Sequence, residues 1–395
     1  TDVLDLTGGT GNVGLGSGSL GTAITTGTDN VAIGEAALDA VTTGSDITAV
    51  GDNAGGAMTT GSQNVAVGSS AALAITTGEN STAVGYQALK TATTTSGNTA
   101  IGENALRDCT GTENTAVGSS AMYDGAGGNE NVAMGNDALV INAGNQNVSI
   151  GGDSMKANTT GDSNTAVGYA ALDANTTGAN NTAIGQDALG AATTADGNTA
   201  VGLSALKLNV TGTSNVAVGK DALRANLESS NTAVGMDALT ANTTGDQNVA
   251  VGKDAAISNT TGNQLVAVGK GALYTHTTGA ANTAVGHQSL YYATTGDDNT
   301  AVGKEALKSV TTASDNTAVG SLAGDAITTG ASNTLVGVNA GGALTTGNNN
   351  VFIGDTAGDA CTTIGNMVGI GYGALTANTG EGNHTAIGMQ SLTAN

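Results

Sequence analysis

The sequence is poor in the residues that build large cores. It has 395 residues with no Pro, no Trp and one Phe, and aromatic residues make up 2% of the chain. Charged residues make up 11%, against about 25% in average proteins. The absence of Pro excludes collagen, and the many Val, Leu and Ile residues argue against a disordered polar tract. We therefore expect an ordered protein without an ordinary large core.

Cations, cysteines and long apolar runs are also scarce. Ten Lys and Arg residues stand against 32 Asp and Glu, which gives a formal net charge of −22. Because phosphate binding needs clustered cations, we expect no nucleic-acid partner. No apolar run approaches the roughly 18–20 residues of a membrane helix, so no membrane insertion is expected. The two cysteines, Cys109 and Cys361, form no disulfide framework.

Glycine is abundant, with 63 residues, and it is periodic. From Gly16 to Gly388, 23 glycines recur at intervals of 16 to 18 residues, most often 17. The consensus around each is Asn-(Thr/Val)-Ala-(Val/Ile)-Gly-x-x-Ala-Leu-x-x-x-Thr-Thr-Gly. We call this recurring residue the anchor glycine, number it position 0, and name each coil by it. The repeat predicts one continuous repeat domain over 1–395. Residues 1–15 are expected to form an irregular N-terminal cap or a preceding coil, and the last repeat is expected to be truncated.

The period predicts an all-β chain. Seventeen residues are too few for the two helices of a helical repeat, whereas Thr-Ala-Val segments bounded by Asn and Gly are typical of short strands and turns. We expect a parallel β-solenoid, or β-roll, of about 23 coils of ~17 residues, each with two short strands. Val or Ile at −1 and Leu at +4 are expected to face the interior.

Asn occupies position −4 in 18 of the 23 repeats. Stacked coils align equal positions, so we expect an internal amide ladder that satisfies the backbone of the turns. The alternative is a simple turn preference of Asn. The predicted ladder includes Asn114, Asn131, Asn147, Asn164, Asn181, Asn198, Asn215, Asn231 and Asn248.

The interior of such a coil is thin, because each coil offers one Val or Ile, one Leu and some Ala. A second face is therefore expected to be buried against copies of the same chain. A homotrimer is the favoured assembly, and a lone solenoid is the alternative.

The segments Asn114–Gly118 and Asn231–Gly235 read Asn-Thr-Ala-Val-Gly. This motif resembles the head repeat of YadA-type trimeric autotransporter adhesins, and Asn164–Gly178 also resembles repeats of bacteriophage tail fibres and large bacterial surface proteins. The resemblance covers nearly the whole chain and implies a left-handed parallel β-roll assembled as a trimer. The period is longer than in the adhesin heads, and neither a heptad stalk nor a membrane-anchor barrel is found in the sequence.

All ten cations fall at positions +1 and +5, where six of the seven Tyr residues also lie. Tyr274 and Tyr291 occupy +5 of consecutive coils, so their rings are expected to stack. With Tyr292, His276 and His287 nearby in sequence, they form a candidate site for a cell-surface glycan. Packing along a solvent-facing edge is the alternative interpretation.

Asp221, Asp237 and Asp254 occupy +2 of three consecutive coils. Stacked carboxylates repel one another, so a Ca²⁺ ion is a candidate ligand. The neighbouring Lys220 and Lys253 offer an alternative compensation. We expect no other cofactor.

No carboxylate pair, nucleophile–base constellation or loop insertion stands out, so we expect no enzyme. The favoured function is a structural rod of an extracellular fibre or adhesin on a cell surface or virion, which holds or forms a receptor-binding surface. The alternative is an ice-binding solenoid that uses its Thr-Thr column, or a monomeric glycan-binding surface solenoid.

Overall fold

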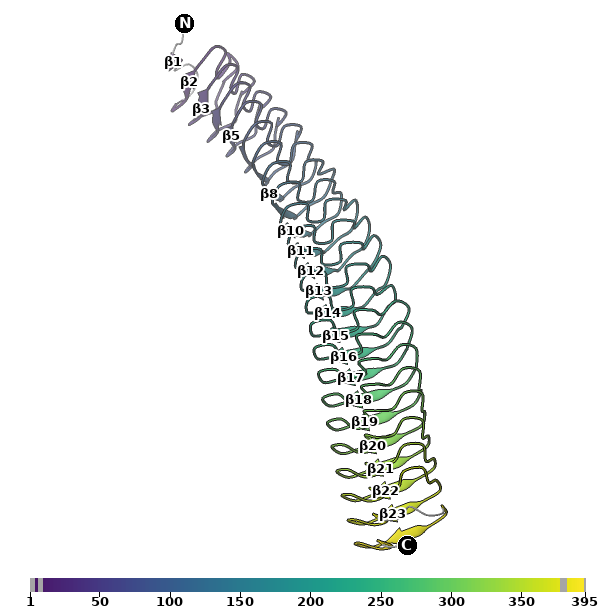
Figure 1. Ribbon diagram of the computed structural model, residues 1–395. Helices are drawn as coiled ribbons and strands as arrows, with labels where there is room; N and C mark the ends of the chain where they lie inside the picture. The colour runs from purple at the N-terminus through teal and green to yellow at the C-terminus, as the bar shows by residue number, and fades with distance from the viewer. Residues whose placement is uncertain (1–3, 6–9, 377–381, 394–395) are drawn as a thin grey trace. The chain divides into compact units, whose positions relative to one another are not determined.

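The computed structural model describes residues 4–5, 10–376 and 382–393 of the chain. It comprises two units, residues 1–197 and 198–395, and each is described by itself. Both units are parallel β-solenoids of about 17 residues per coil, and the described residues contain no helix, hence none able to cross a membrane. Figure 1 shows the strands following one another within each unit, one strand per coil.

Each unit contributes twelve strands. The first unit contains β1 (Leu4–Asp5), β2 (Val13–Leu15), β3 (Val31–Ile33), β4 (Thr48–Val50), β5 (Val65–Val67), β6 (Thr82–Val84), β7 (Thr99–Ile101), β8 (Thr115–Val117), β9 (Val132–Met134), β10 (Val148–Ile150), β11 (Thr165–Val167) and β12 (Thr182–Ile184). The second contains β13 (Thr199–Val201), β14 (Val216–Val218), β15 (Thr232–Val234), β16 (Val249–Val251), β17 (Val266–Val268), β18 (Thr283–Val285), β19 (Thr300–Val302), β20 (Thr317–Val319), β21 (Thr334–Val336), β22 (Val351–Ile353), β23 (Val368–Ile370) and β24 (Thr385–Ile387).

Within each unit, equal repeat positions pair with one another. Strands β3 and β4 pair in parallel with Ala32 opposite Ala49, and β16 and β17 pair with Ala250 opposite Ala267. Strand β1, within the expected cap 1–15, pairs antiparallel with β2. Residues 1–3 and 6–9 of that cap lie outside the described residues. The parallel solenoid predicted from the period is confirmed.

The strand side chains face the opposite way from our expectation. Ala32 at −2 is fully buried, whereas Ile33 at −1 is 38% exposed. Ala at +3 and Leu at +4, such as Ala37 and Leu38, complete the interior. The prediction that Val or Ile at −1 lies inside is therefore wrong. Because strand residues alternate, burying the small −2 side chain turns −3 and −1 outward, and the narrow coil accommodates Ala best.

The second expected strand is also absent from the described coils, which carry one strand of three residues each. Positions +2 and +4 instead adopt left-handed backbone conformations, as in Asn53 (φ 56°) and Leu38 (φ 52°). Such residues break a strand. Hydrogen bonds between coils still form, as from the Leu38 amide to the Ala54 carbonyl at 3.1 Å.

The anchor glycine is required by close contact between coils. Gly151 has φ +129°, and a Cβ atom there would lie 2.5 Å from the carbonyl oxygen of Gly168. A side chain is excluded both by this backbone conformation and by the next coil. The anchor glycine therefore ends each strand and lets successive coils approach.

Candidate functional site

The outward strand residues form the main candidate surface, which we call the strand face: positions −3 and −1 of the coils in each unit. Side chains at −1 are substantially exposed, for example Ile101 at 41% and Ile184 at 40% in the first unit, and Val234 and Val251 at 37% in the second. Position −3 is mostly half-buried. The strand face is thus a solvent-facing sheet surface with two columns of side chains.

The strand face keeps one chemical character. Position −3 is Thr or Val in every described coil, and position −1 is Val or Ile except at Leu15 and Met134. No charged residue occurs in these strands β2–β24. By contrast, the exposed +1 position ranges from charged and aromatic to aliphatic residues, as in Glu35, Tyr86, Leu203 and Lys253. The uniformity therefore belongs to this face and not to exposed positions in general.

The nine Asn residues predicted for the ladder are all buried, at 1% exposure or less. Nδ2 of Asn164 donates to the carbonyl of Gly178 in its own coil at 2.8 Å, and Oδ1 accepts the backbone amide of Asn181 in the next coil at 3.0 Å. The same pattern recurs in the second unit, where Asn231 Oδ1 accepts the amide of Asn248 at 2.9 Å. These bonds satisfy backbone groups that the thin coil buries.

A second buried polar column occupies +7, and our sequence reasoning missed it. Asn158 donates to Oδ1 of Asn142 at 2.8 Å and accepts from Asn175 at 2.7 Å. In the second unit, Asn242 likewise joins Asn226 and Asn259. The available signal was the recurrence of Asn at +7 with Gly at +10. A Cβ at Gly161 would lie 2.3 Å from the carbonyl oxygen of Gly178 in the next coil and 2.5 Å from Asn158 Oδ1, so both the backbone and the amide exclude a side chain there.

The structure separates His276 from the tyrosines of the candidate glycan site. His276 occupies +7 and is fully buried, with Nδ1 3.2 Å from Asn259 Oδ1 and Nε2 3.3 Å from Asn282 Nδ2. Burial lowers the pKa of His276 to about 4, against a weak opposing effect of Asp297. Its ring continues the polar column and is inaccessible to a ligand at the surface. His287, at +1, is exposed on the outside.

The three tyrosines do come together. The rings of Tyr274 and Tyr291 stack with centroids 4.8 Å apart and planes 7° apart, as their +5 positions predicted. Tyr292 meets Tyr291 edge-on, also at 4.8 Å. Desolvation by these neighbours raises the pKa of Tyr291. The stacking covers one face of Tyr274 and one face of Tyr291.

Asp221, Asp237 and Asp254 all have left-handed backbone conformations, with φ between 56° and 60°. A short Asp or Asn side chain tolerates this conformation better than most residues do, which explains their presence at +2 without a metal. Asp221 pairs with Lys220 at 3.4 Å and Asp254 with Lys253 at 2.6 Å. Across the described ranges, no group of three or more His, Cys, Asp or Glu is placed to hold a metal ion.

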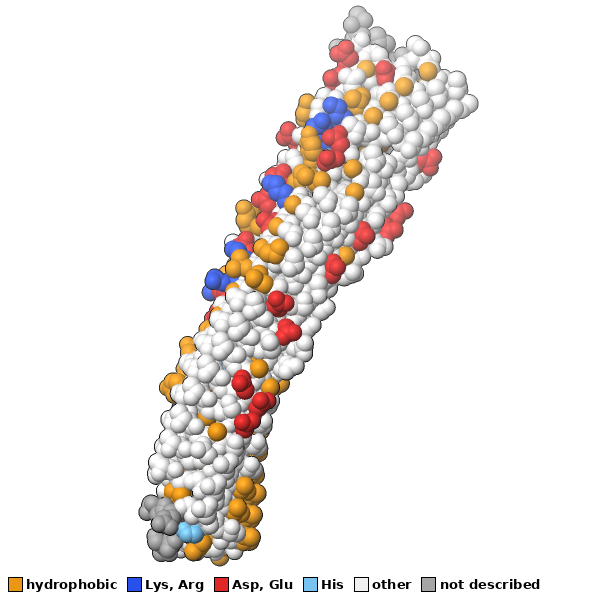
Figure 2. All heavy atoms as spheres, turned by 90° about the vertical axis from the view of Figure 1, so that its right-hand side faces the viewer, with side chains coloured by type: hydrophobic (Ala, Val, Ile, Leu, Met, Phe, Trp, Pro, Cys, Tyr) orange, Lys and Arg blue, Asp and Glu red, His pale blue; other side chains and the backbone are white. Residues whose placement is uncertain are grey.

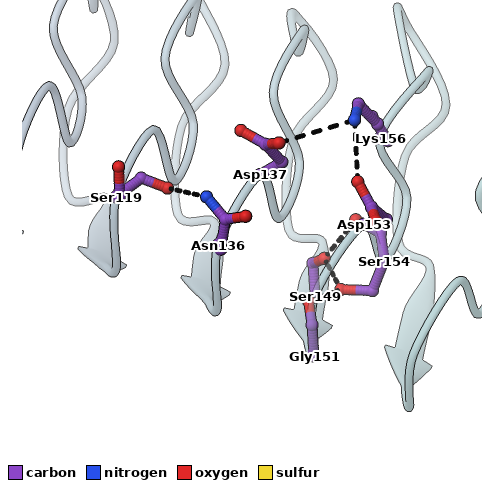
Figure 3. A network of polar contacts seen from close by, with 8 residues as sticks. All are labelled: Ser119, Asn136, Asp137, Ser149, Gly151, Asp153, Ser154 and Lys156. Atoms are coloured by element: carbon purple, nitrogen blue, oxygen red, sulfur yellow. Dashed lines mark hydrogen bonds and ion pairs between the residues drawn. The ribbon is translucent and has the colours of Figure 1, made fainter.

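Positions +1, +2 and +5 lie close together on one edge. Figure 3 shows Lys156 at +5 reaching Asp153 of its own coil at 2.7 Å and Asp137 of the preceding coil at 3.5 Å. The hydrogen bond with Asp153 raises the pKa of Lys156. On the face drawn in Figure 2, Lys and Arg lie along one edge among carboxylates, and other carboxylates lie apart from them.

The Thr-Thr column differs from a free hydroxyl array. Thr at +8 donates its hydroxyl to the carbonyl of the next coil, as in Thr243 to Thr260 at 3.0 Å. The following Thr at +9, such as Thr261 and Thr278, is exposed. The Thr hydroxyls at +8 are therefore already bonded to the backbone, and only the Thr at +9 offers an exposed hydroxyl in each such coil.

The chain matches no protein-family model, and a search of curated proteins returns no similar protein.

Proposed function

We propose that this protein is a non-catalytic structural component of an extracellular fibre or surface adhesin, on a cell or a virion, whose chains associate through the strand face as a homotrimer. The single observation that carries the proposal is the exposed, uncharged and uniform strand face of both units. The fibre or adhesin role and the number of three chains rest on the resemblance to YadA-type heads and tail-fibre repeats.

Self-association would remove the strand face from water. Ten strand spacings of about 4.8 Å and a width of about 10 Å give a surface on the order of 500 Å² in each unit. A typical soluble monomer has a largest apolar patch of about 300–600 Å², so the strand face is distinguished by its regularity and not by its area. Covering the −1 side chains, such as Val302 and Val319, would contribute about 25 cal/mol for each Å² removed from water.

The uniformity of the strand face also restricts which molecule can cover it. Apart from Leu15 and Met134, every described coil presents Thr or Val at −3 and Val or Ile at −1, at one strand spacing. A surface that matches all coils at once must repeat at that spacing. A second copy of this chain, aligned coil to coil, meets this condition, whereas an ordinary globular partner does not.

Charge substitutions on the strand face test the proposal. Val234→Lys and Val251→Lys place ammonium groups at 37%-exposed positions. We expect the double variant to keep the β circular dichroism spectrum and to lose association, measured by sedimentation velocity. Met236→Lys, on the +1 edge at 39% exposure, is the matched control and should still associate. Unchanged association of the strand-face variant would contradict the proposal.

Ice binding is the second candidate function, and one observation favours it. The strand face presents outward Thr at many −3 positions beside aliphatic −1 residues, as in Thr300 and Val302. A regular uncharged array of methyl and hydroxyl groups is suited to ordering water. Ice requires this face to be free, so a monomer with thermal hysteresis would favour this function over self-association.

A further inference from the structure

Four consecutive coils of the second unit carry a cationic or imidazole side chain at +1: Lys253, Lys270, His287 and Lys304. All four are exposed. Successive coils lie about 4.8 Å apart, so the four groups span roughly 14 Å in a line. The chain has 10 cations in 395 residues, so this run stands out against an acidic background.

The two central members of the line have no adjacent carboxylate in their own coil. Lys253 pairs with Asp254 at 2.6 Å, and Lys304 with Glu305 at 3.4 Å. At the same +2 position, Lys270 is followed by Gly271 and His287 by Gln288. Lys270 forms no ion pair with any residue that the structure describes. The centre of the line is therefore available to an anion.

A tyrosine ring lies beside this centre. Gly271 leaves room for Tyr291, because a Cβ there would be only 3.3 Å from Tyr291 Cε2. Tyr291 therefore packs next to the backbone that follows Lys270, and Tyr292 beside it is 47% exposed. We call Lys253, Lys270, His287, Lys304, Tyr291 and Tyr292 the basic–aromatic strip.

We propose that the basic–aromatic strip binds a linear acidic polysaccharide that runs along the coil stack. A sugar carboxylate would meet Lys270 in a charge-assisted hydrogen bond, and further carboxylates along the polymer would compete with Asp254 and Glu305 for Lys253 and Lys304. Sugar hydroxyls would bond the outward hydroxyls of Tyr291 and Tyr292. This binding function is independent of self-association through the strand face.

The tyrosine geometry favours a saccharide over a single-stranded nucleic acid. Base recognition relies on stacking against open aromatic faces. Here Tyr274 covers one face of Tyr291 at 4.8 Å, and Tyr292 packs against Tyr291 as well. These two contacts reduce the open aromatic surface of Tyr291, whereas the phenol hydroxyls can bond a polyhydroxylated ligand. The net charge of −22 repels a polyanion elsewhere and confines it to the strip.

The test measures binding of a fluorescent oligogalacturonate to the full chain by anisotropy, with dextran and an oligodeoxythymidylate as comparison probes. We expect oligogalacturonate binding that weakens with salt, and little binding of either comparison probe. Lys270→Glu should weaken the affinity by at least about tenfold, and Lys270→Arg should largely retain it.

Lys220→Glu is the matched control, since it makes the same charge change at +1 but is separated from the strip by Met236. It should change the affinity by less than about twofold. The proposal is overturned if folded wild-type chain does not bind the uronate, if both Glu variants weaken it equally, or if the oligodeoxythymidylate binds more tightly. Circular dichroism verifies the fold of each variant.

Discussion

At the scale of single residues, two requirements of the coil explain most of the repeat. The anchor glycine lies where both φ and the next coil exclude a side chain, and the Asn at −4 satisfies backbone groups of its own and the next coil. The sequence period made both positions visible. It did not show that +2 and +4 adopt left-handed conformations, because Leu at such a position is unusual.

Substitutions at two adjacent glycines test whether the anchor position requires glycine. Gly151→Ala places a Cβ 2.5 Å from the Gly168 carbonyl oxygen at φ +129°, whereas Gly152→Ala meets nothing closer than 3.6 Å. We expect the first variant to lose at least about 2 kcal/mol of stability and the second to stay within about 0.5 kcal/mol. Urea unfolding followed by circular dichroism measures both. Equal losses would show that the close contact is not decisive.

Burial of His276 makes the stability of the surrounding coils depend on pH. The folded pKa is about 4 and the ordinary value is 6.5, so the unfolded chain takes up the proton first as pH falls. Stability is therefore unaffected above pH ~6.5, decreases between ~6.5 and ~4, and levels off below, with a total loss on the order of 3 kcal/mol.

Amide hydrogen exchange in the Gly252 to Gly286 coils, compared at pH 7 and 4.5, measures this loss. His276→Asn is the control, because Asn259 occupies the same column in the preceding coil and does not titrate. The variant should lose the acid sensitivity of these coils. If it keeps the wild-type pH dependence, other groups are responsible.

At the scale of the coil, a large side chain at one interior position is compensated by a small residue at a neighbouring interior position. Phe352 replaces Ala at −2, and Gly358 replaces Leu at +4 beside it, where a Cβ would lie 2.4 Å from the Phe352 ring. Such compensation keeps a close-packed core filled. The coil period and one strand of each coil were predictable from the repeat, whereas the second expected strand is absent from the described coils. Which strand side faces inward was not predictable, because it depends on this narrow interior and on the turn that follows.

The +7 amide column gives a prediction at this scale. Asn158→Ala removes the donor to Asn142 Oδ1 and the acceptor for Asn175 Nδ2. These two bonds and the one from Asn158 Nδ2 to the Gly161 carbonyl are buried, so their removal is expected to cost about 2–3 kcal/mol in urea unfolding. Thr160→Ala, exposed in the same coil, should cost less than about 0.5 kcal/mol. A small loss for Asn158→Ala would mean that water replaces the amide.

At the scale of the whole molecule, the proposed assembly depends on what covers the strand face. Sequence reasoning predicted that one face of the coil packs on other copies, but it placed the Val and Ile of −1 inside. The structure turns them outward, with Ile101 and Val336 at 41% and 36% exposure. It also places Tyr274 and Tyr291 together and removes His276 from their surface.

The most direct test of the central claim is the mass of the purified protein in solution, by multi-angle light scattering at moderate salt. One chain weighs 37.7 kDa, and we predict a particle of three chains, stable on dilution. A clean monomer at micromolar concentration would contradict association through the strand face and leave that face free for ice or another periodic surface.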